Sequence, residues 1–311
     1  MVEDNQIKAQ VSPFAIREGE IKTFDGKDGY VSMNQIVHKI NIGHINEIHF
    51  AILDLVNEFE FITSRQLYQM LEIKGFDPKS QDKLNNKLDQ LVKSKILTRY
   101  YFTSDEGKGI YRIYCLEKMG KYLLNSKEVD CKWQPSDNTK PVPMIKKRLA
   151  GNQTLIAYLR KVKAFDSYVV KPAINAKVSG KIFKATGGSV KLTKNNKSIQ
   201  FVFEVIRREN EWQKKLVDKM RLYKDFYENF VLGDSGFSSM PQLILICEDE
   251  KHMAETFKEI VKNSVEIPQI KLYFTTDLRQ NNETLEETLV EFKLVDGKYK
   301  MENIELKLLG M

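Results

Sequence analysis

A short amphipathic segment around residue 80 carries side chains that could recognise DNA. Leucines recur at helical spacing there, so the polar side chains gather on the opposite face of one helix. Asn and Gln can bond an adenine edge twice, and Lys can reach guanine or phosphate. Asp82 and Asp89 share that face and would repel phosphate, so a solvated helix used only for protein contact is an alternative. The predicted DNA-contacting residues of this recognition helix are Lys79, Lys83, Asn86, Gln90 and Lys93.

A second group of basic residues lies in the middle of the chain, around Gly187-Gly188. On a hairpin turning at these glycines, lysines would form a ridge that holds phosphate without reading sequence. The equal alternative is an edge hairpin kept soluble by its lysines. Several further cations follow closely and favour DNA. The predicted phosphate contacts are Lys181, Lys184, Lys191, Lys194, Arg207, Arg208 and Lys214, with Lys108 as a weaker candidate in an earlier loop.

A lone carboxylate, Glu204, interrupts the apolar run from Phe201 to Ile206. A charge inside an apolar strand is costly to bury without a partner. We therefore expect Glu204 to pair with Lys215 or Lys219 of the following helix, either as a structural bridge or as the remnant of a metal site.

The elements that would position the recognition helix follow one another from residue 44 to residue 125. Apolar residues recur at helical spacing between Ile45 and Phe59, Thr63 and Ser64 are N-cap candidates for a second helix, and Ser80 is one for the third. Two runs rich in aromatic and β-branched residues, 96–102 and 110–116, flank a polar loop with glycines and predict a hairpin. This order of helices and strands is that of a winged helix-turn-helix.

The remaining segments complete the predicted organisation. Residues 1–43 are expected to form a partly ordered arm, and the proline-containing residues 126–144 a linker. In residues 145–311, short apolar strands alternate with helices, which indicates a mixed sheet covered by helices. One helix near 145–165 is weakly broken at Gly151. The predicted fold class is α+β or α/β, a winged helix-turn-helix followed by a mixed-sheet α/β domain.

Charge is distributed unevenly over the 311 residues, whose net charge is +7. Residues 160–227 carry 17 basic and 6 acidic groups, a net of +11, whereas residues 228–311 carry 9 and 16, a net of −7. A basic middle favours a polyanionic partner. Three separated cysteines fit thiols of a reducing cytoplasm, and no run approaches the ~18 apolar residues of a membrane span. We expect a cytoplasmic protein without a membrane partner.

Several segments together resemble the replication-relaxation family of plasmids and mobile elements, over about residues 44–277. They are the run Phe61–Leu67, the helix and hairpin from Leu88 to Leu116, the strand Phe203–Val205 with the helix Trp212–Tyr223, and the strand Leu243–Glu248. The resemblance implies a winged helix before a domain similar to the PD-(D/E)XK nuclease fold.

The chain departs from an active nuclease of that type at two places. Two carboxylates would bind the metal and a lysine would stabilise developing charge. Asn175 or Lys177 stands where an Asp is needed, and Ile206 stands where a Lys is needed. If cleavage persisted, Glu204, Lys215 and Lys219 would carry it. His44 and His49 point to different sides of a helix and form no metal pair. We expect no catalytic residue, metal or cofactor.

The sequence thus predicts a non-enzymatic protein that binds double-stranded DNA sequence-specifically in a plasmid, phage or conjugative element. The resemblance implies a role at a replication or transfer origin, with a relaxase or replication initiator as partner; transcriptional regulation falls within the same prediction. A metal-dependent nickase or endonuclease, and an interaction adaptor of a relaxosome or replisome, are the alternatives. A homodimer stays open.

Overall fold

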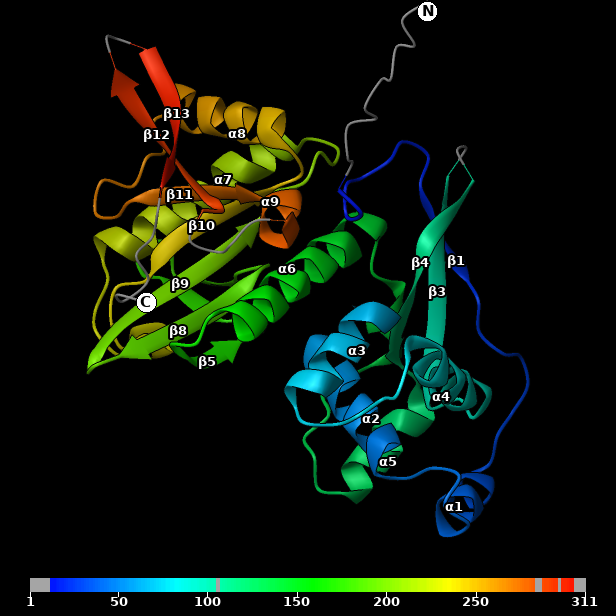
Figure 1. The fold of residues 1–311 in the computed structure, drawn as a ribbon. Helices are drawn as coiled ribbons and strands as arrows, with labels where there is room; N and C mark the ends of the chain where they lie inside the picture. Colours follow the sequence, from blue (N-terminus) through cyan, green and yellow to red (C-terminus); the bar gives the residue numbers. More distant parts are fainter. Residues whose placement is uncertain (1–11, 105–106, 283–286, 296–297, 305–311) are drawn as a thin grey trace, which may run out of the picture.

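The long helix α6 (Val142–Lys161) lies between two separate sheets in the computed structural model (Figure 1). The structure describes residues 12–104, 107–282, 287–295 and 298–304. We call residues 12–126 the N-terminal half and residues 142–304 the C-terminal half.

The N-terminal half packs helices against a small antiparallel sheet. The sheet order is β1-β3-β4-β2, and β3 and β4 form a long hairpin (Figure 1). The expected order of helices and strands between residues 44 and 125 is present. The elements are β1 (Ile21–Phe24), α1 (Met33–Asn41), α2 (Glu47–Phe59), β2 (Ile62–Thr63), α3 (Ser64–Ile73), α4 (Gln81–Lys93), β3 (Leu97–Ser104), β4 (Gly107–Leu116) and α5 (Lys118–Ser126).

Side-chain caps start helices α3 and α4 where the sequence predicts. The Thr63 hydroxyl accepts a hydrogen bond from the Gln66 amide, and the Ser80 hydroxyl accepts one from the Lys83 amide. Each cap satisfies an amide that has no partner inside the helix. Leu67 of α3 and Leu84 and Leu88 of α4 are fully buried, so both helices are anchored by one apolar face.

Two connecting segments are more structured than expected. In the arm, residues 21–24 form β1 and pair with β3, and residues 33–41 form a capped helix. The 126–144 segment is largely exposed, but it is anchored to the N-terminal half: it contains a 3-10 helix, η1 (Pro135–Thr139), and the buried side-chain amide of Asn138 donates to the Leu116 carbonyl at 2.8 Å. The Lys121 side chain in turn donates to the Trp133 carbonyl of the segment at 2.8 Å.

The C-terminal half is built on a seven-stranded mixed sheet of order β13-β12-β11-β10-β9-β8-β5. Strands β9, β10 and β11 are parallel, and the flanking pairs are antiparallel. The pair β6-β7 stands apart as a two-stranded sheet. The elements are β5 (Phe165–Val169), β6 (Ala173–Ala176), β7 (Lys181–Lys184), β8 (Gly188–Lys194), β9 (Lys197–Val205), α7 (Trp212–Glu228), η2 (Asp234–Gly236), β10 (Gln242–Cys247), α8 (Glu250–Lys262), β11 (Leu272–Thr276), α9 (Asp277–Asn282), β12 (Leu289–Val295) and β13 (Lys298–Ile304).

Helices cover both faces of this sheet, as the apolar strands predict. Phe201 and Phe203 of β9 face α6 and belong to a core that extends into the N-terminal half. Val202 faces α7 and α8 in a second core. Because side chains alternate along a strand, Glu204 points to the α7 side.

Gly151 does not break α6, contrary to expectation. It permits contact instead: a Cβ on Gly151 would lie 2.7 Å from the Gly187 Cα and from the Thr186 carbonyl oxygen. The glycines at 187 and 188 therefore let the chain pass beneath α6 into β8. The β8–β9 hairpin turns at Asn195 and Asn196, both with positive φ.

The coarse prediction of a mixed α+β protein is confirmed. Within the described ranges, no helix has the combination of length and apolarity that crossing a bilayer requires.

Candidate nucleic-acid interface

One exposed face of α4 carries the predicted recognition residues. Leu84, Leu88, Leu91 and Val92 are buried, and the side chains of Lys83, Asn86, Gln90 and Lys93 are exposed on the other side. Lys79 precedes the cap in a positive-φ conformation and is also exposed.

The side chains of this face differ in whether they already bond to neighbouring residues. Lys79 pairs with Asp77 at 2.5 Å, and Lys93 pairs with Asp89 at 2.6 Å. Gln90 lies 3.2 Å from the buried His49 ring. The Asn86 amide has no hydrogen-bond partner within the described part of the chain. It is therefore the group on this face best placed to bond a base edge.

A shallow surface cavity of about 660 Å³ lies over the same face and adds residues that sequence reasoning missed. Lys87 and Asn46 line it beside Lys83 and Asn86. Lys87 follows Lys83 by one helical turn, so the i, i+4 spacing could have identified it. Asn46 belongs to the α2 cap, and no local pattern links it to α4.

The hairpin beside α4 contributes little free charge. Arg99 and Arg112 both contact the Asp25 carboxylate, at 3.0 and 3.1 Å. The backbone of Lys108 pairs with Thr103 in β4, but its side chain lies outside the described residues, so the prediction for Lys108 is not addressed.

A larger groove opens between the two halves, and we call it the arginine groove. Its volume is about 1540 Å³, and its basic residues come from distant parts of the chain: Arg65 of α3, Arg112 of β4, and Arg160 and Lys161 of α6. Gln81 and Asn85 of α4 also line it. Arg65 is exposed and has no ion-pair partner among described residues, and Arg160 lies 3.9 Å from Glu72. Sequence reasoning missed this groove because only tertiary packing unites its members.

The predicted lysine ridge is divided between two hairpins. Lys181 and Lys184 lie on β7, whereas Lys191 and Lys194 lie on β8. Lys191 pairs with Asp166 at 3.1 Å. Gly187-Gly188 joins β7 to β8 and is not a hairpin turn, so the lysines do not form one continuous ridge about it.

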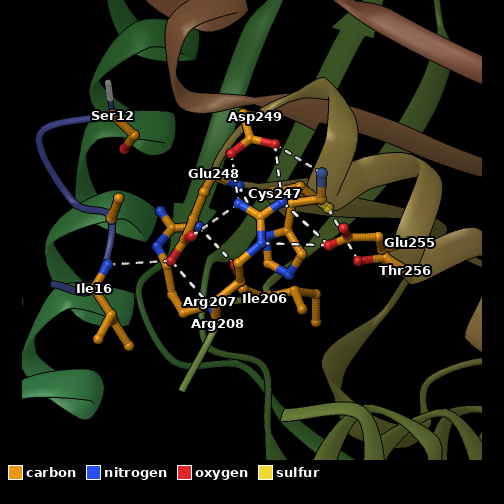
Figure 2. A network of polar contacts seen from close by, with 12 residues as sticks. Ser12, Ile16, Ile206, Arg207, Arg208, Cys247, Glu248, Asp249, Glu255 and Thr256 are labelled. Carbon is orange, nitrogen blue, oxygen red and sulfur yellow. Dashed lines mark hydrogen bonds and ion pairs between the residues drawn. The ribbon is translucent and has the colours of Figure 1, made fainter. Parts of the chain in front are cut away.

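Arg207 and Arg208 follow β9 and enter a polar network at the carboxyl ends of the parallel strands (Figure 2). Arg207 is fully buried and forms two 2.8 Å bonds to the Asp277 carboxylate. The prediction that Arg207 contacts DNA is therefore wrong, because no part of its guanidinium reaches the surface. Arg208 is held by Asp249 and Glu255, which neutralise it. Lys214, at the start of α7, is exposed.

The N-terminal segment, residues 12–20, covers this network and bonds to it. The Ile16 amide donates to Glu248 at 3.2 Å (Figure 2), and the Phe14 carbonyl accepts from Arg207 at 3.1 Å. Lys146 of α6 reaches the Ala15 carbonyl and forms a buried ion pair with Glu20. Crevices at the carboxyl ends of parallel strands are common ligand sites, and here the chain itself fills the position.

Glu204 is buried and fully partnered on the α7 side of β9. It accepts hydrogen bonds from the Thr186 hydroxyl at 2.8 Å and the Tyr223 hydroxyl at 2.7 Å, and Lys219 lies 3.6 Å away. Burial, reinforced by the Glu204 charge, raises the pKa of Tyr223, so the phenol stays a donor. The predicted pairing with Lys219 is present, whereas Lys215 pairs with Glu209 instead.

The surroundings of Glu204 are not those of a metal centre. Thr186, rather than Asn175 or Lys177, lies beside it, and none of its contacts is a second carboxylate. Within the described ranges, no three metal-ligating side chains of the His, Cys, Asp or Glu type come together. The arrangement can stabilise the sheet, but it offers no pair of carboxylates to activate water.

No family model, curated protein or solved structure matches this chain. The resemblance to the replication-relaxation family stays a prediction.

Proposed function

We propose that this chain is a non-enzymatic double-stranded DNA-binding protein in which residues 44–125 act as a winged helix. The observation that carries the proposal is the outer face of α4, where Lys83 and Asn86 are exposed beside Lys87 and Gln90. A helix anchored by one leucine stripe and presenting an amide between lysines suits a major groove. The order α2-β2-α3-α4-β3-β4 supports the winged-helix assignment.

The arginine groove would hold the DNA backbone next to that helix. Arg65 and Arg160 line the same groove as Gln81 and Asn85 of α4, so phosphate contacts there would lie next to the recognition helix. Phosphate contacts supply affinity and orientation, whereas base contacts supply specificity.

In this proposal the C-terminal half is a nuclease-like domain without cleavage activity. The succession α6-β5-β8-β9-α7-β10, with β8 antiparallel and β10 parallel to β9, supports the PD-(D/E)XK-like assignment. Because Glu204 is paired with Lys219 and hydrogen-bonded to Thr186 and Tyr223, a structural role for this carboxylate is favoured over a catalytic role in a nickase.

We further propose a setting in a plasmid, phage or conjugative element, at an origin or as a regulator, beside a relaxase or replication initiator. This part rests on the family resemblance alone. The adaptor alternative differs in requiring no DNA contact by α4.

The test is selection of bound fragments from random double-stranded DNA, followed by affinity measurements over a salt series. Asn86→Ala should weaken the selected site by about 1–3 kcal/mol and leave random DNA unaffected. Arg65→Gln should weaken both and reduce the salt slope by about 1. Lys258→Gln, on the exposed side of α8, is the matched control. Absence of binding at low salt refutes the proposal and favours the adaptor.

A further inference from the structure

A second cavity between the two halves is lined by cations, of which only Lys184 is among the predicted DNA-phosphate contacts. Its volume is about 960 Å³. Residues from α2, η1, α6 and the segments before β6 and β8 line it. We call it the lysine cavity and define it by Lys140, Arg148, Lys171, Lys184 and Glu60.

Glu60 is the carboxylate on which three of these cations converge. Lys171 contacts it directly, Lys140 lies 3.2 Å away and Arg148 lies 3.7 Å away. The Glu60 backbone has φ 64° and ψ −61°, and the following amide, that of Phe61, donates to the Phe59 carbonyl at 2.8 Å. This γ-turn is strained for a residue other than glycine. The strained turn at the end of α2 places the carboxylate against cations of the other half.

Positive charge exceeds negative charge in the lysine cavity. Asp137 also pairs with Lys140, at 3.1 Å, but Lys184 has no carboxylate partner in the part of the chain that is described. Over the whole lining, six cations face four carboxylates: Lys132, Lys140, Lys147, Arg148, Lys171 and Lys184 against Glu58, Glu60, Asp130 and Asp137. The Arg148 side chain is only 11% exposed, and one of its donors reaches the Val170 carbonyl at 2.8 Å. A largely buried guanidinium with remaining donors is suited to bind an oxyanion in a bidentate manner.

Burial acts against these charges in the unliganded protein. Desolvation lowers the pKa of Arg148 to about 10, although Glu204 partly opposes the effect. Desolvation, together with the charge of Lys184, lowers the pKa of Lys171 to about 8. An anion bound between them would relieve both effects.

We propose that the lysine cavity binds the phosphate group of a nucleotide-sized ligand, with the Glu60 carboxylate as a built-in competitor for the same cations. Lys171, Lys184 and Arg148 would contact the phosphate oxygens, and the Thr186 side chain lines the same wall. The half-buried rings of Trp133 and Tyr168 also line the cavity and could pack against a base. The cavity volume lies in the range of small-molecule sites. The phosphate could belong to a free nucleotide or to the end of an oligonucleotide.

The test is isothermal titration calorimetry of the full chain with pyrophosphate as the probe, at an ionic strength held constant with NaCl. Lys184→Gln should weaken binding roughly ten- to hundredfold, the effect of losing one charge-assisted hydrogen bond. Glu60→Gln should tighten binding, because the competitor is removed while the cations stay. Lys258→Gln, an exposed lysine outside the cavity, should match the original protein.

Thermal melts of each variant separate loss of binding from loss of folding, and Lys184 is an exposed side chain whose replacement disturbs no described ion pair. Competition by ADP, or by a short oligonucleotide with a 5′-phosphate but not a 5′-hydroxyl, identifies the source of the phosphate. No saturable binding to the original protein or to Glu60→Gln overturns the proposal. Equal affinities for Lys184→Gln and Lys258→Gln overturn it as well.

Discussion

Arg207 is fully buried, whereas the neighbouring Arg208 is partly exposed, and this burial leads to a stability prediction. It is buried at the end of β9 and bonded twice to Asp277, while the Ser12 hydroxyl also reaches that carboxylate. Asp277→Asn should lower the free energy of unfolding by about 3–5 kcal/mol, because it leaves a buried guanidinium without its counter-charge. Urea unfolding followed by circular dichroism measures the loss.

The exposed Asp28 provides the control for this change, and Asp28→Asn should have no measurable effect. An equally small effect of Asp277→Asn would show that the buried pair contributes no stability.

His252 should make the protein acid-sensitive. Its ring is buried, stacks edge-on against Trp212 at 4.8 Å and accepts from the Glu248 amide at Nδ1. Desolvation, followed by the charges of Arg208 and Arg207, lowers its pKa to about 3, while Asp249 partly opposes the shift. The unfolded chain therefore binds a proton that the folded protein excludes, and this contribution to stability is lost as pH falls below about 6.5.

The expected slope from this residue is about 1.4 kcal/mol per pH unit between pH 6.5 and 3. Urea unfolding at pH 7, 6 and 5 measures it, and His252→Gln should remove that component of the slope. His38→Gln, at an exposed histidine of α1, should retain it. Parallel slopes for the original protein and His252→Gln would contradict the assignment.

Single residues were predictable where their own chemistry sets their environment. The cost of an unpaired carboxylate in an apolar strand predicts the partner that Glu204 finds in Lys219. The prediction that Arg207 contacts DNA was wrong because a side chain's charge does not reveal whether the fold buries it. Arg65 and Arg160 were missed because their proximity depends on α3 packing beside α6.

Helices and strands were predictable where a local pattern defines them. Leucine spacing and caps place α3 and α4, and apolar runs place β9 and β10. Strand β1 was missed because its four residues depend on pairing with β3, about eighty residues away. The prolines of 126–144 predict a linker, although Lys121 and Lys22 donate to the Trp133 and Lys140 carbonyls of this segment.

The N-terminal segment, residues 12–20, should contribute to stability beyond what its lack of regular structure suggests. Phe14 is only 5% exposed and packs against Tyr111 at 5.9 Å between ring centres. Phe14→Ala should lower the free energy of unfolding by about 3 kcal/mol, the cost of emptying a buried aromatic site. Phe24→Ala, at a 48% exposed ring of β1, is the control and should cost less. Equal losses would show that residues 12–20 are not anchored by Phe14.

Charge at the scale of the molecule is less concentrated than the sequence suggests. The net +11 of residues 160–227 is spread over separate hairpins, the buried Arg207 and several ion pairs. The charge available to a partner instead includes Arg65 and Lys83 of the N-terminal half. A polyanionic partner thus stays a prediction from composition, and composition does not indicate which surface would bind it.

The two halves share one core, which predicts that they unfold together. The hydrophobic core containing Leu67 continues through α6 to Phe203. Buried hydrogen bonds cross the boundary in both directions. The side-chain amide of Gln66 donates to the Leu149 carbonyl, and the side-chain amide of Asn152 donates to the Phe61 carbonyl, each at 2.7 Å. Separating the halves would leave these groups unpaired, so neither half should persist alone as denaturant increases.

The two tryptophans test this directly, because Trp133 lies beside the N-terminal half and Trp212 begins α7. Fluorescence of Trp212→Phe then reports on the first region and that of Trp133→Phe on the second. Their urea transitions should each coincide with the circular dichroism transition of the same variant. Asn152→Leu removes one cross-boundary donor. Introduced into each single-tryptophan variant, it should shift the urea midpoint of both by the same amount. A fluorescence midpoint displaced from the circular dichroism midpoint in either variant would mean that α6 joins two independently folding bodies.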